Sequence, residues 1–503
     1  MLAPVLPSNS MTVTFIGAVT ILLCNTLHAQ TYQLITSGLD AVSFESGLTE
    51  LEAGDVNGDG KIDIVTIGDH GSPNVNATEA GIMVWVNNGN GTNWSLLKQG
   101  DFGYGGVALG DVNNDGIMDI GYAMHHNYGS GDFGDQLIET ALGDGSGSSW
   151  TPYDDGLAKS GETYGMFGID FADIDNDGLL DLGSNSFGCC NGFHVYRNNG
   201  DGSWTQTFAK NGGNSNQWAK FGDFNNDGNA DLIVALDGNQ IWSNDGTGKF
   251  TPMQNGLHLG YNFDLDVADV NNDGAADIAI ASPGAQVYFF ETATSTWQSI
   301  STGLPTRGVQ AIRVADMDMD GKADVVIWSS RSVSIYKADQ AFQWSLLTSF
   351  TTSETSISGM TIADFDHDGF NDIAYLASTN SGDNKLRVYL HVPDNPTLKI
   401  LPIFPRGGEH FVGGSAQFLR WLSSAPLTDS ATVTVQFSSN GPAGPWTNVA
   451  KNALNSNFYQ WILPKINSSN CYLRYKIKAA TGSRQITTRL AFSISTSTDS
   501  FSD

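Results

Sequence analysis

The chain has 503 residues, and its 53 acidic residues outnumber its 24 basic residues to give a net charge of −29. Such acidity argues against a nucleic-acid partner, because nucleic acids bind basic surfaces. Four cysteines are too few for disulfides to form the framework of a chain this long.

The first 30 residues resemble a secretory signal peptide. An apolar stretch runs from Val13 to Leu23, and Leu27-His28-Ala29 provides a small-residue end before Gln30. The segment holds no Lys or Arg, so the usual positive start is missing, and Met11 is an alternative first residue. The stretch is too short to span a membrane. We therefore expect a secreted protein, extracellular or on the cell surface, without a transmembrane segment.

Residues 31–395 are organised by a nine-residue motif, Asp-x-(Asp/Asn)-x-Asp-Gly-x-x-Asp, which occurs seven times. Successive copies begin 46 to 62 residues apart, a period long enough for one four-stranded unit per copy. Positions 1, 3, 5 and 9 carry oxygen-bearing side chains. In chain order these are Asp55, Asn57, Asp59 and Asp63; Asp111, Asn113, Asp115 and Asp119; Asp173, Asp175, Asp177 and Asp181; Asp223, Asn225, Asp227 and Asp231; Asp269, Asn271, Asp273 and Asp277; Asp316, Asp318, Asp320 and Asp324; and Asp364, Asp366, Asp368 and Asp372.

The motif predicts a metal loop. Carboxylates crowded this closely repel one another unless a cation neutralises them, and glycine at position 6 allows the sharp turn that a chain around an ion needs. All-oxygen ligation favours Ca²⁺ over Zn²⁺ or Mg²⁺. The alternative is a set of Asx-turns between strands with no ion. Repetition of all four positions favours up to seven Ca²⁺ sites, which we expect to be weaker where position 3 is Asn.

The motif resembles the start of an EF-hand loop but differs from it in two respects. An EF-hand has a bidentate Glu at position 12, and these copies have none. A β-branched or apolar run follows the motif, as in Asp231-Leu232-Ile233-Val234, and predicts a buried strand where an EF-hand has a helix.

The strand pattern around each motif predicts an all-β fold. A short strand leads into the motif, a buried strand follows it, and an aromatic third strand, a Gly-rich turn and a fourth strand complete the repeat. Four strands in each of seven repeats predict a seven-bladed β-propeller. Residues 32–39 match the fourth-strand pattern but precede the first motif, whereas the seventh repeat lacks a fourth strand. We therefore expect residues 32–39 to close the last blade.

Residues 31 to about 393 resemble the FG-GAP or VCBS repeats of integrin α-subunit propellers, bacterial secreted repeat proteins and some fungal propeller lectins. The resemblance implies calcium in the loop between the first and second strands of a blade, and ligand binding on the opposite face. Integrin propellers usually carry calcium motifs in only some blades, whereas all seven motifs are complete here. This difference favours the VCBS-type and lectin-like relatives over an integrin chain.

Loops opposite the motifs are long only in the first three repeats, which indicates a ligand surface there. Aromatic residues that precede first strands could stack on sugar rings, or they could seal the junctions between blades. These residues are Tyr104, Tyr164, Trp218 and Tyr261.

Each of two residue clusters in these loops allows a functional and a purely structural interpretation. His125, His126, Asp132 and Asp135 could bind a transition metal, but a solvated Gly-rich loop is favoured because nothing in the pattern orders them. Adjacent Cys189 and Cys190 could form a vicinal disulfide, but an ordinary loop pair is favoured.

Beyond Pro396 the metal motif disappears. Residues 396–492 have the length and strand pattern of a β-sandwich, and the segment Val433 to Ser439 with Pro445-Trp446-Thr447 and Tyr459-Gln460-Trp461 is similar to immunoglobulin-like or fibronectin-like modules of bacterial secreted proteins. Cys471 falls in a predicted core strand and is expected to be a buried thiol. The Ser/Thr/Asp-rich residues 493–503 are predicted to be disordered.

Three functional hypotheses follow from these features. The first is a non-enzymatic recognition or adhesion protein for an extracellular glycan or protein, with glycan favoured. The second is a self-associating subunit of an extracellular filament or matrix. The third is a calcium-dependent polysaccharide-active enzyme, which no catalytic motif in the sequence supports.

Overall fold

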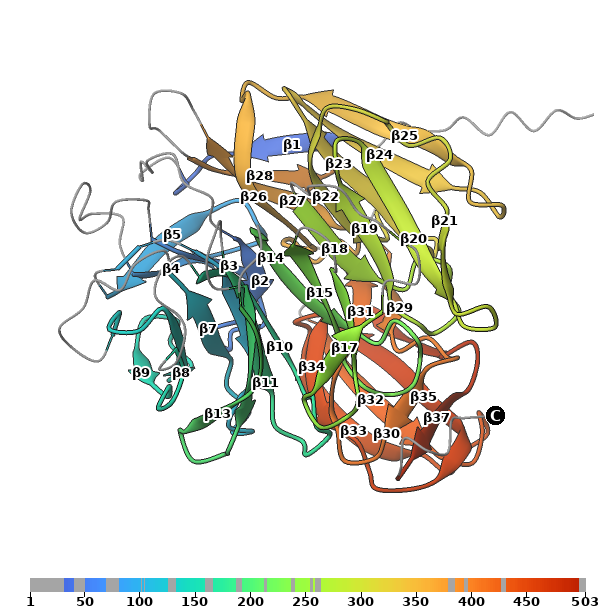
Figure 1. The fold of residues 1–503 in the computed structure, drawn as a ribbon. Coiled ribbons are helices and arrows are strands. Elements are labelled where there is room, and N and C mark those ends of the chain that lie inside the picture. Colours follow the sequence, from blue (N-terminus) through green and yellow to red (C-terminus); the bar gives the residue numbers. More distant parts are fainter. Residues whose placement is uncertain are drawn as a thin grey trace, which may run out of the picture.

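The computed structural model describes residues 31–39, 50–68, 81–100, 102–103, 105–124, 133–158, 166–186, 192–211, 215–236, 240–253, 257, 264–378, 385–392, 397–426 and 431–496. These residues form 37 β-strands and no helix, so the described part of the chain is all-β (Figure 1). It follows that no described helix has the length and apolarity needed to cross a membrane.

The described residues up to His391 form seven four-stranded sheets with antiparallel neighbours. The first comprises β2 (Glu52–Gly54), β3 (Asp63–Ile67), β4 (Ile82–Asn87) and β5 (Trp94–Gln99), and the second β6 (Val107–Gly110), β7 (Asp119–Ala123), β8 (Ile138–Gly143) and β9 (Trp150–Pro152). The third comprises β10 (Met166–Ala172), β11 (Asp181–Ser186), β12 (Phe193–Asn198) and β13 (Trp204–Lys210), and the fourth β14 (Ser215–Gly222), β15 (Asp231–Leu236), β16 (Ile241–Asn244) and β17 (Phe250–Pro252).

The remaining sheets of this part repeat the pattern, except that the last takes one strand from the start of the chain. The fifth comprises β18 (Asp264–Ala268), β19 (Asp277–Ala281), β20 (Ala285–Glu291) and β21 (Thr296–Ser299), and the sixth β22 (Val309–Ala315), β23 (Asp324–Ser329), β24 (Ser332–Ala338) and β25 (Trp344–Thr351). The seventh has the order β1-β28-β27-β26, from β1 (Tyr32–Ile35), β28 (Lys385–His391), β27 (Asp372–Ser378) and β26 (Ser356–Ala363).

Apolar sequence explains why the second strand of each sheet is internal. All five residues of β3, Asp63–Ile67, are buried, as are those of β7 and β19. A run that is apolar on both faces must be covered on both faces, so neighbouring sheets pack against it. Tryptophans at or next to the start of fourth strands strengthen this packing. The Trp204 indole N–H donates to the carbonyl of Tyr153 (2.7 Å) and that of Trp297 to Met253 (3.0 Å), each in the preceding repeat.

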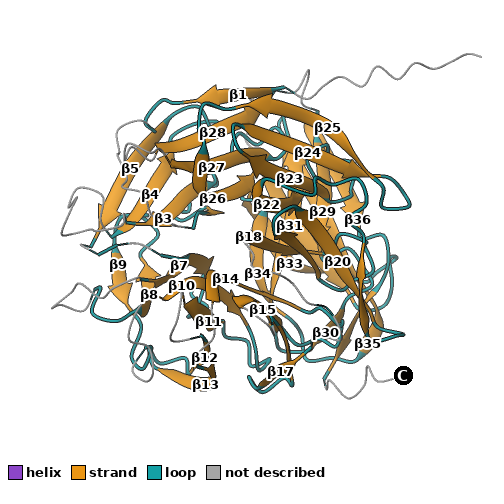
Figure 2. Ribbon diagram, turned by 45° about the horizontal axis from the view of Figure 1, so that its top comes forward, coloured by secondary structure: helices purple, strands orange, loops and turns teal. Residues whose placement is uncertain are grey.

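The sheets follow one another around a common centre (Figure 2). Their first strands contact one another in the order β2, β6, β10, β14, β18, β22 and β26, and β26 contacts β2 again. β1 pairs with β28 from Tyr32 opposite His391 to Ile35 opposite Val388. The Asn87 side chain of the first sheet donates to the carbonyl of Phe365 in the seventh (2.8 Å). Repeated four-stranded sheets in this arrangement are consistent with the blades of a propeller.

The C-terminal strands form two further sheets. A three-stranded sheet has the order β29 (Lys399–Phe404), β31 (Ala416–Ser424) and β34 (Phe458–Ile462). The second sheet has the order β30 (His410–Val412), β37 (Phe492–Ser495), β35 (Ser468–Ala479), β32 (Thr432–Ser438) and β33 (Thr447–Leu454), with β36 (Gly482–Thr487) paired to β35.

Buried side chains from both C-terminal sheets share one core, which includes Trp421, Leu473 and Tyr475. Cys471 is a buried free thiol in this core. β37 continues to Ser495, past the boundary expected at residue 492, because Phe492 and Ile494 are both buried there. We call residues 397–426 and 431–496 the C-terminal module.

Candidate metal centres

Each copy of the acidic motif lies in the loop between the first and second strands of a sheet. The third copy, for example, begins after Ala172 at the end of β10 and ends at Asp181, the first residue of β11. Position 9 opens the second strand in every sheet, and its side chain is fully buried in all copies. These residues are Asp63, Asp119, Asp181, Asp231, Asp277, Asp324 and Asp372. We call these segments loops 1 to 7 in chain order.

Two left-handed residues shape each loop. The glycine at position 6 has φ between +85° and +98° in all copies, where a side chain would be strained. Position 4 also has positive φ, between +56° and +69°, and is occupied by Gly58, Asn114, Asn176, Asn226, Asn272, Met319 and His367. Sequence reasoning missed position 4. The signal was its recurrent Asn, the residue that tolerates this conformation best after Gly.

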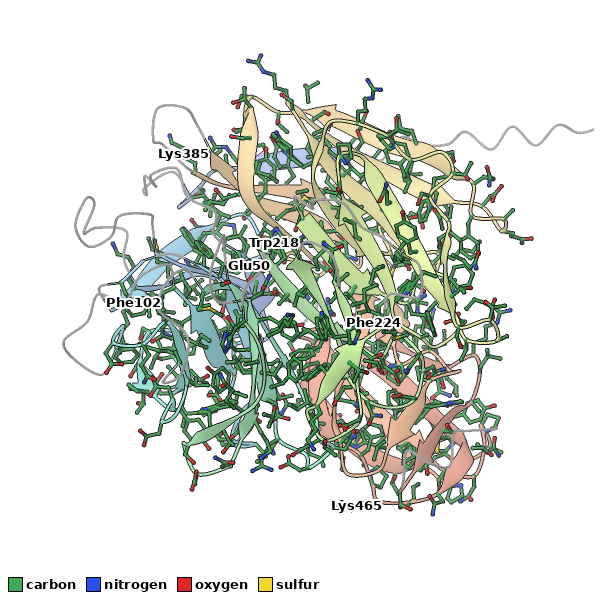
Figure 3. All side chains as sticks on the ribbon, viewed as in Figure 1. Glu50, Phe102, Trp218, Phe224, Lys385 and Lys465 are labelled. Carbon is green, nitrogen blue, oxygen red and sulfur yellow. The ribbon has the colours of Figure 1, made fainter. Side chains whose placement is uncertain are left out.

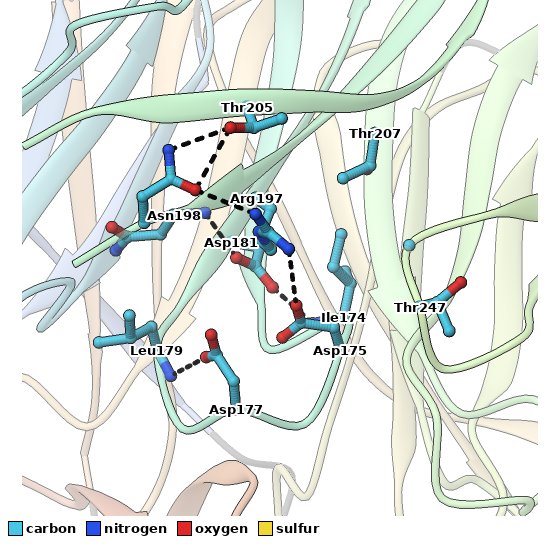
Figure 4. Close-up of polar contacts among 12 residues, drawn as sticks. Ile174, Asp175, Asp177, Leu179, Asp181, Arg197, Asn198, Thr205, Thr207 and Thr247 are labelled. Atoms are coloured by element: carbon cyan, nitrogen blue, oxygen red, sulfur yellow. Dashed lines mark hydrogen bonds and ion pairs between the residues drawn. The ribbon is translucent and has the colours of Figure 1, made fainter.

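Backbone amides hold the first and last carboxylates of the loop in place. In loop 3, Asp173 accepts hydrogen bonds from the amides of Asp177 (3.1 Å) and Gly178 (2.9 Å). Asp181 accepts from the amides of Ile174 (2.9 Å) and Asn198 (2.8 Å), and Figure 4 shows its carboxylate close to Asp175. The bond from the position-6 glycine to the position-1 carboxylate recurs in all copies at 2.7–3.1 Å.

Carboxylate oxygens converge in three of the loops closely enough to share one ion. Within each group, one oxygen per residue lies within 4.8 Å of the others: Asp173, Asp175 and Asp181; Asp316, Asp318 and Asp320; and Asp364, Asp366 and Asp372. Buried carboxylate oxygens without a hydrogen-bond partner occur in several loops, at Asp63, Asp175, Asp277, Asp324 and Asp364. A buried unpaired carboxylate is costly, and a hard divalent cation would supply the missing partner. The acidic clusters could therefore bind metal ions.

Electrostatics support the same interpretation. Burial, together with the charges of neighbouring motif carboxylates, raises the pKa of Asp63 and Asp173 to about 7 and that of Asp324 to about 8. Asp55 and Asp316 have pKa values raised by burial to about 6. Carboxylates that resist ionisation near neutral pH lack a compensating charge, and a bound cation supplies one.

Comparison with protein families identifies the repeat. The model of the FG-GAP-like repeat matches residues 55–122, 186–234, 223–280, 269–327 and 316–375, which together cover just over half of the chain. The chain belongs to the FG-GAP-like repeat family. Four of these FG-GAP-like matches begin at position 1 of a loop and end twelve residues into the next copy, so the family's period is the period of the loops. No curated protein matches the chain.

Solved structures show distant likeness to this FG-GAP-like repeat protein. A lectin from Agrocybe aegerita that recognises non-reducing terminal N-acetylglucosamine is 20% identical over 60% of this chain and 81% of its own, with a TM-score of 0.40. A protein from Lactobacillus plantarum is 12% identical over 64% of this chain and 95% of its own, with a TM-score of 0.41. The Tc holotoxin pore of Photorhabdus luminescens is 12% identical over 90% of this chain and 19% of its own, with a TM-score of 0.38.

Basic residues enter two of the FG-GAP-like loops from the third strand of the same sheet. The Lys337 ammonium contacts both Asp318 and Asp320, the latter at 2.6 Å, and Arg197 lies 4.0 Å from Asp175. Both are the penultimate residues of their strands, β24 and β12. Sequence reasoning missed them, although a basic residue at the same place in two repeats was a usable signal.

The predicted ligand-contact aromatics are only partly within the described residues. Trp218, labelled in Figure 3, is 4% exposed and belongs to an apolar cluster with Ile233 and with Leu265 of the next sheet, where it fits the role of sealing a junction between sheets. Tyr104, Tyr164 and Tyr261 lie outside the described residues, as do His125, His126 and Asp132 and the pair Cys189 and Cys190.

Sequence reasoning also missed a set of charged residues on the first strands. Glu52, Asp170, Lys220, Asp266 and Arg313 each stand three residues before position 1 of their loop. Lys220 pairs with Glu52 at 2.9 Å, and Arg313 with Asp264 at 2.6 Å. Lys220 also lies 3.9 Å from Asp170 on the neighbouring first strand, so residues at this register meet both between adjacent sheets and between the first and fourth sheets. The shared offset was visible in the sequence, but the pairing was not.

Proposed function

We propose that this chain is a secreted, calcium-binding recognition protein without enzymatic activity, built on a closed seven-bladed β-propeller and a C-terminal β-sandwich. The donor set supports calcium, because all ligands are oxygens on a short flexible loop. An extracellular location supports the same ion, because calcium there is concentrated enough to fill weak sites. Residues 1–30 supply the export signal in this proposal.

The closed ring is supported by strand contacts. The first strands contact one another in a cycle that returns from β26 to β2, and β1 lies beside β28 as the fourth strand of the last sheet. Such a sheet joins the two ends of the repeat region, so it would act as the latch of the ring.

One observation carries the recognition proposal: the C-terminal module packs on the side of the ring that carries the loops. Its Gln460 side chain, for example, donates to the carbonyl of Asp111 in loop 2 (2.7 Å). We therefore assign ligand binding to the opposite ends of the first strands. In sequence, Tyr104, Tyr164 and Tyr261 precede those strands, whereas the loops follow them. Tyrosine rings stack on sugar faces, so we favour an extracellular glycan.

A glycan array tests this assignment with the full secreted chain in calcium. We expect calcium-dependent binding that falls at least tenfold, ~1.4 kcal/mol, when Tyr104, Tyr164 and Tyr261 are all changed to Ala. The matched triple Tyr→Phe variant retains the rings and should retain binding. A blank array with calcium-loaded protein would contradict the glycan assignment, and assembly into polymers in size-exclusion chromatography would favour the filament hypothesis instead.

A further inference from the structure

The C-terminal module contacts all seven loops. Hydrogen bonds reach six of them: Gln460 to loop 2, Ala416 to loop 3, His410 to loop 4, Arg406 to loops 5 and 6, and Asn457 to loop 7. At loop 1, the side chain of Leu454 lies so close to Gly60 that an added Cβ would stand 3.2 Å from it. In Figure 1, the strands of the module, β29 to β37, lie beside the ring.

The Gln460 side chain both accepts a hydrogen bond from loop 2 and donates hydrogen bonds to it. Its side-chain oxygen accepts from the amide of Asp111 (3.1 Å), and its nitrogen donates to the carbonyl of Asp111 (2.7 Å) and to the side-chain oxygen of Asn114 (3.3 Å). Asp111 is position 1 of the loop and Asn114 is its left-handed position 4. The three bonds can therefore form together only when the loop has this shape.

The segment from Arg406 to His410, the first residue of β30, bridges loops 4, 5 and 6. The Arg406 guanidinium donates to the side chain of Asn272 and to the carbonyl of Gly321 (2.8 Å). The His410 amide donates to the side chain of Asn226 (2.8 Å). Asn226 and Asn272 occupy the left-handed position 4 of their loops, and Gly321 occupies position 6.

Two contacts reach carboxylates of the acidic motif itself. The Ala416 amide donates to Asp173 (2.9 Å), and the Asn457 side chain donates to Asp364 (3.4 Å). Both carboxylates are buried and stand at position 1 of their loops. Donors that bind a ligating carboxylate orient it, so the module would act on the metal ligands of loops 3 and 7 directly.

We infer that the C-terminal module is a cation-dependent cap, docked on the ring only while the loops hold their ions. The inference rests on the calcium sites proposed above. Its physical basis is that the hydrogen bonds between module and ring described above all end on residues of the loops, beside an apolar cluster that Ala416 of the module shares with Val112 and Leu180 of the loops. When the ions leave, the crowded carboxylates repel one another and the loops change shape. The hydrogen bonds between the module and the loops are then lost together. By linkage, docking must strengthen ion binding by the same factor by which ions strengthen docking.

The first experiment compares the full chain in saturating calcium and in excess chelator. Native mass spectrometry counts bound ions, and small-angle X-ray scattering measures the radius of gyration. We expect a compact particle with ions bound, and a larger radius with two separated bodies after chelation. Hydrogen exchange should then rise at residues 406–410 and in β34, while β35 in the core of the module stays protected.

The second experiment weakens the cap without touching the acidic motif. A Gln460→Ala, Arg406→Ala variant is compared with the matched variant Gln485→Ala, Arg484→Ala, whose residues are exposed on β36. Loss of two groups of hydrogen bonds should raise the calcium concentration at half-compaction roughly tenfold. Reciprocity requires calcium affinity to fall by the same factor, and the matched variant should behave as the native chain.

The outcomes separate this inference from the proposed function. Ions lost on chelation with an unchanged radius and unchanged exchange at residues 406–410 would overturn the cap while leaving the calcium sites intact. Absence of bound ions in saturating calcium would overturn both. The single variants Gln460→Ala and Arg406→Ala are measured as well. If either one folds and leaves both the calcium concentration at half-compaction and the calcium affinity unchanged, the assigned contacts do not couple docking of the module to calcium binding.

Discussion

Lys337 brings a positive charge of the protein into an acidic loop. Its ammonium contacts Asp318 and Asp320, which are positions 3 and 5 of loop 6. Burial would lower the pKa of Lys337, but hydrogen bonds with these two carboxylates raise it above its ordinary value. Loop 6 has four aspartates and so has the charge of a strong site, yet its lysine competes for the same oxygens.

We therefore predict that Lys337→Met increases the calcium affinity of loop 6 about tenfold, ~1.4 kcal/mol, by removing this competitor. Isothermal titration and native mass spectrometry at limiting calcium measure the change. Lys322→Met is the matched control, because Lys322 lies in the same loop at the variable position 7. The gain should disappear in a Lys337→Met, Asp316→Asn double variant, and a gain that persists there would show that another loop is responsible.

Glu50 gives a second prediction at this scale. Its side chain is 5% exposed and accepts a hydrogen bond from the Val107 amide (3.2 Å). Burial raises the pKa of Glu50 to about 8, although the Lys220 charge opposes the shift. The folded protein thus keeps a proton that the unfolded chain releases between about pH 4.5 and pH 8. Its contribution to stability is present at low pH and is lost as pH rises through this window.

Glu50→Gln keeps the acceptor and removes the ionisation. We predict that the variant and the native chain have similar unfolding free energies near pH 5, and that the variant is more stable by roughly 2–4 kcal/mol at pH 8. Urea unfolding in saturating calcium from pH 5 to pH 9 measures this. A difference that does not grow with pH would contradict the buried-acid interpretation.

At the scale of elements, β1 joins distant parts of the chain, because it comes first in sequence and forms the outer strand of the last sheet. Ile35 is 6% exposed in a core shared with Trp85 and Leu376, whereas neighbouring Leu34 is 43% exposed. The two side chains point to opposite faces of one strand. They therefore form a matched pair for testing whether β1 holds the sheet.

We predict that Ile35→Asp lowers the free energy of unfolding by about 3 kcal/mol or more, because it buries an unpaired charge, while Leu34→Asp changes it by less than ~0.5 kcal/mol. Hydrogen exchange should accelerate in β28 and not in β16. Equal effects of the two variants would show that the burial of this strand is not what stabilises the sheet.

At the scale of the whole molecule, the proposed calcium sites predict that stability depends on calcium and pH together. Without ions, Asp63 and Asp173 have pKa values raised to about 7 and Asp324 to about 8, all above the ordinary value of 3.8. The folded ion-free chain therefore binds more protons than the unfolded chain between about pH 4 and pH 8. Its stability falls as pH rises through that range.

Calcium should reverse this trend, because it binds the ionised carboxylates. We predict that the melting temperature in chelator falls from pH 5 to pH 8, while the stabilisation by calcium grows over the same range. Each site contributes ~2.7 kcal/mol when calcium exceeds its dissociation constant 100-fold. Differential scanning calorimetry with calcium or chelator measures both trends, and identical pH profiles in the two conditions would contradict the metal loops.

The local features of this fold were readable from residues close together in sequence. The position-6 glycine of each motif has the positive φ that the pattern required, and apolar runs after the motif form buried second strands. All four candidate ligands of a loop fall within nine residues, so their spacing alone predicts that they come together. The repeated period predicted four-stranded sheets, because the same pattern must fold in the same way each time.

Other features exist only because distant segments meet. Three contacts join residues whose separation in sequence says nothing about their distance in space. They are the ion pair of Lys337 with loop 6, the ion pair of Lys220 with Glu52, and the hydrogen bond of Gln460 to Asp111. The burial of Trp218 depends likewise on the neighbouring sheet. The sequence by itself thus determined the acidic loops and the strands around them, through short-range spacing and periodicity. Only the tertiary structure decided which charges neutralise one another and which side of the ring the C-terminal module covers, because those depend on packing across the whole chain.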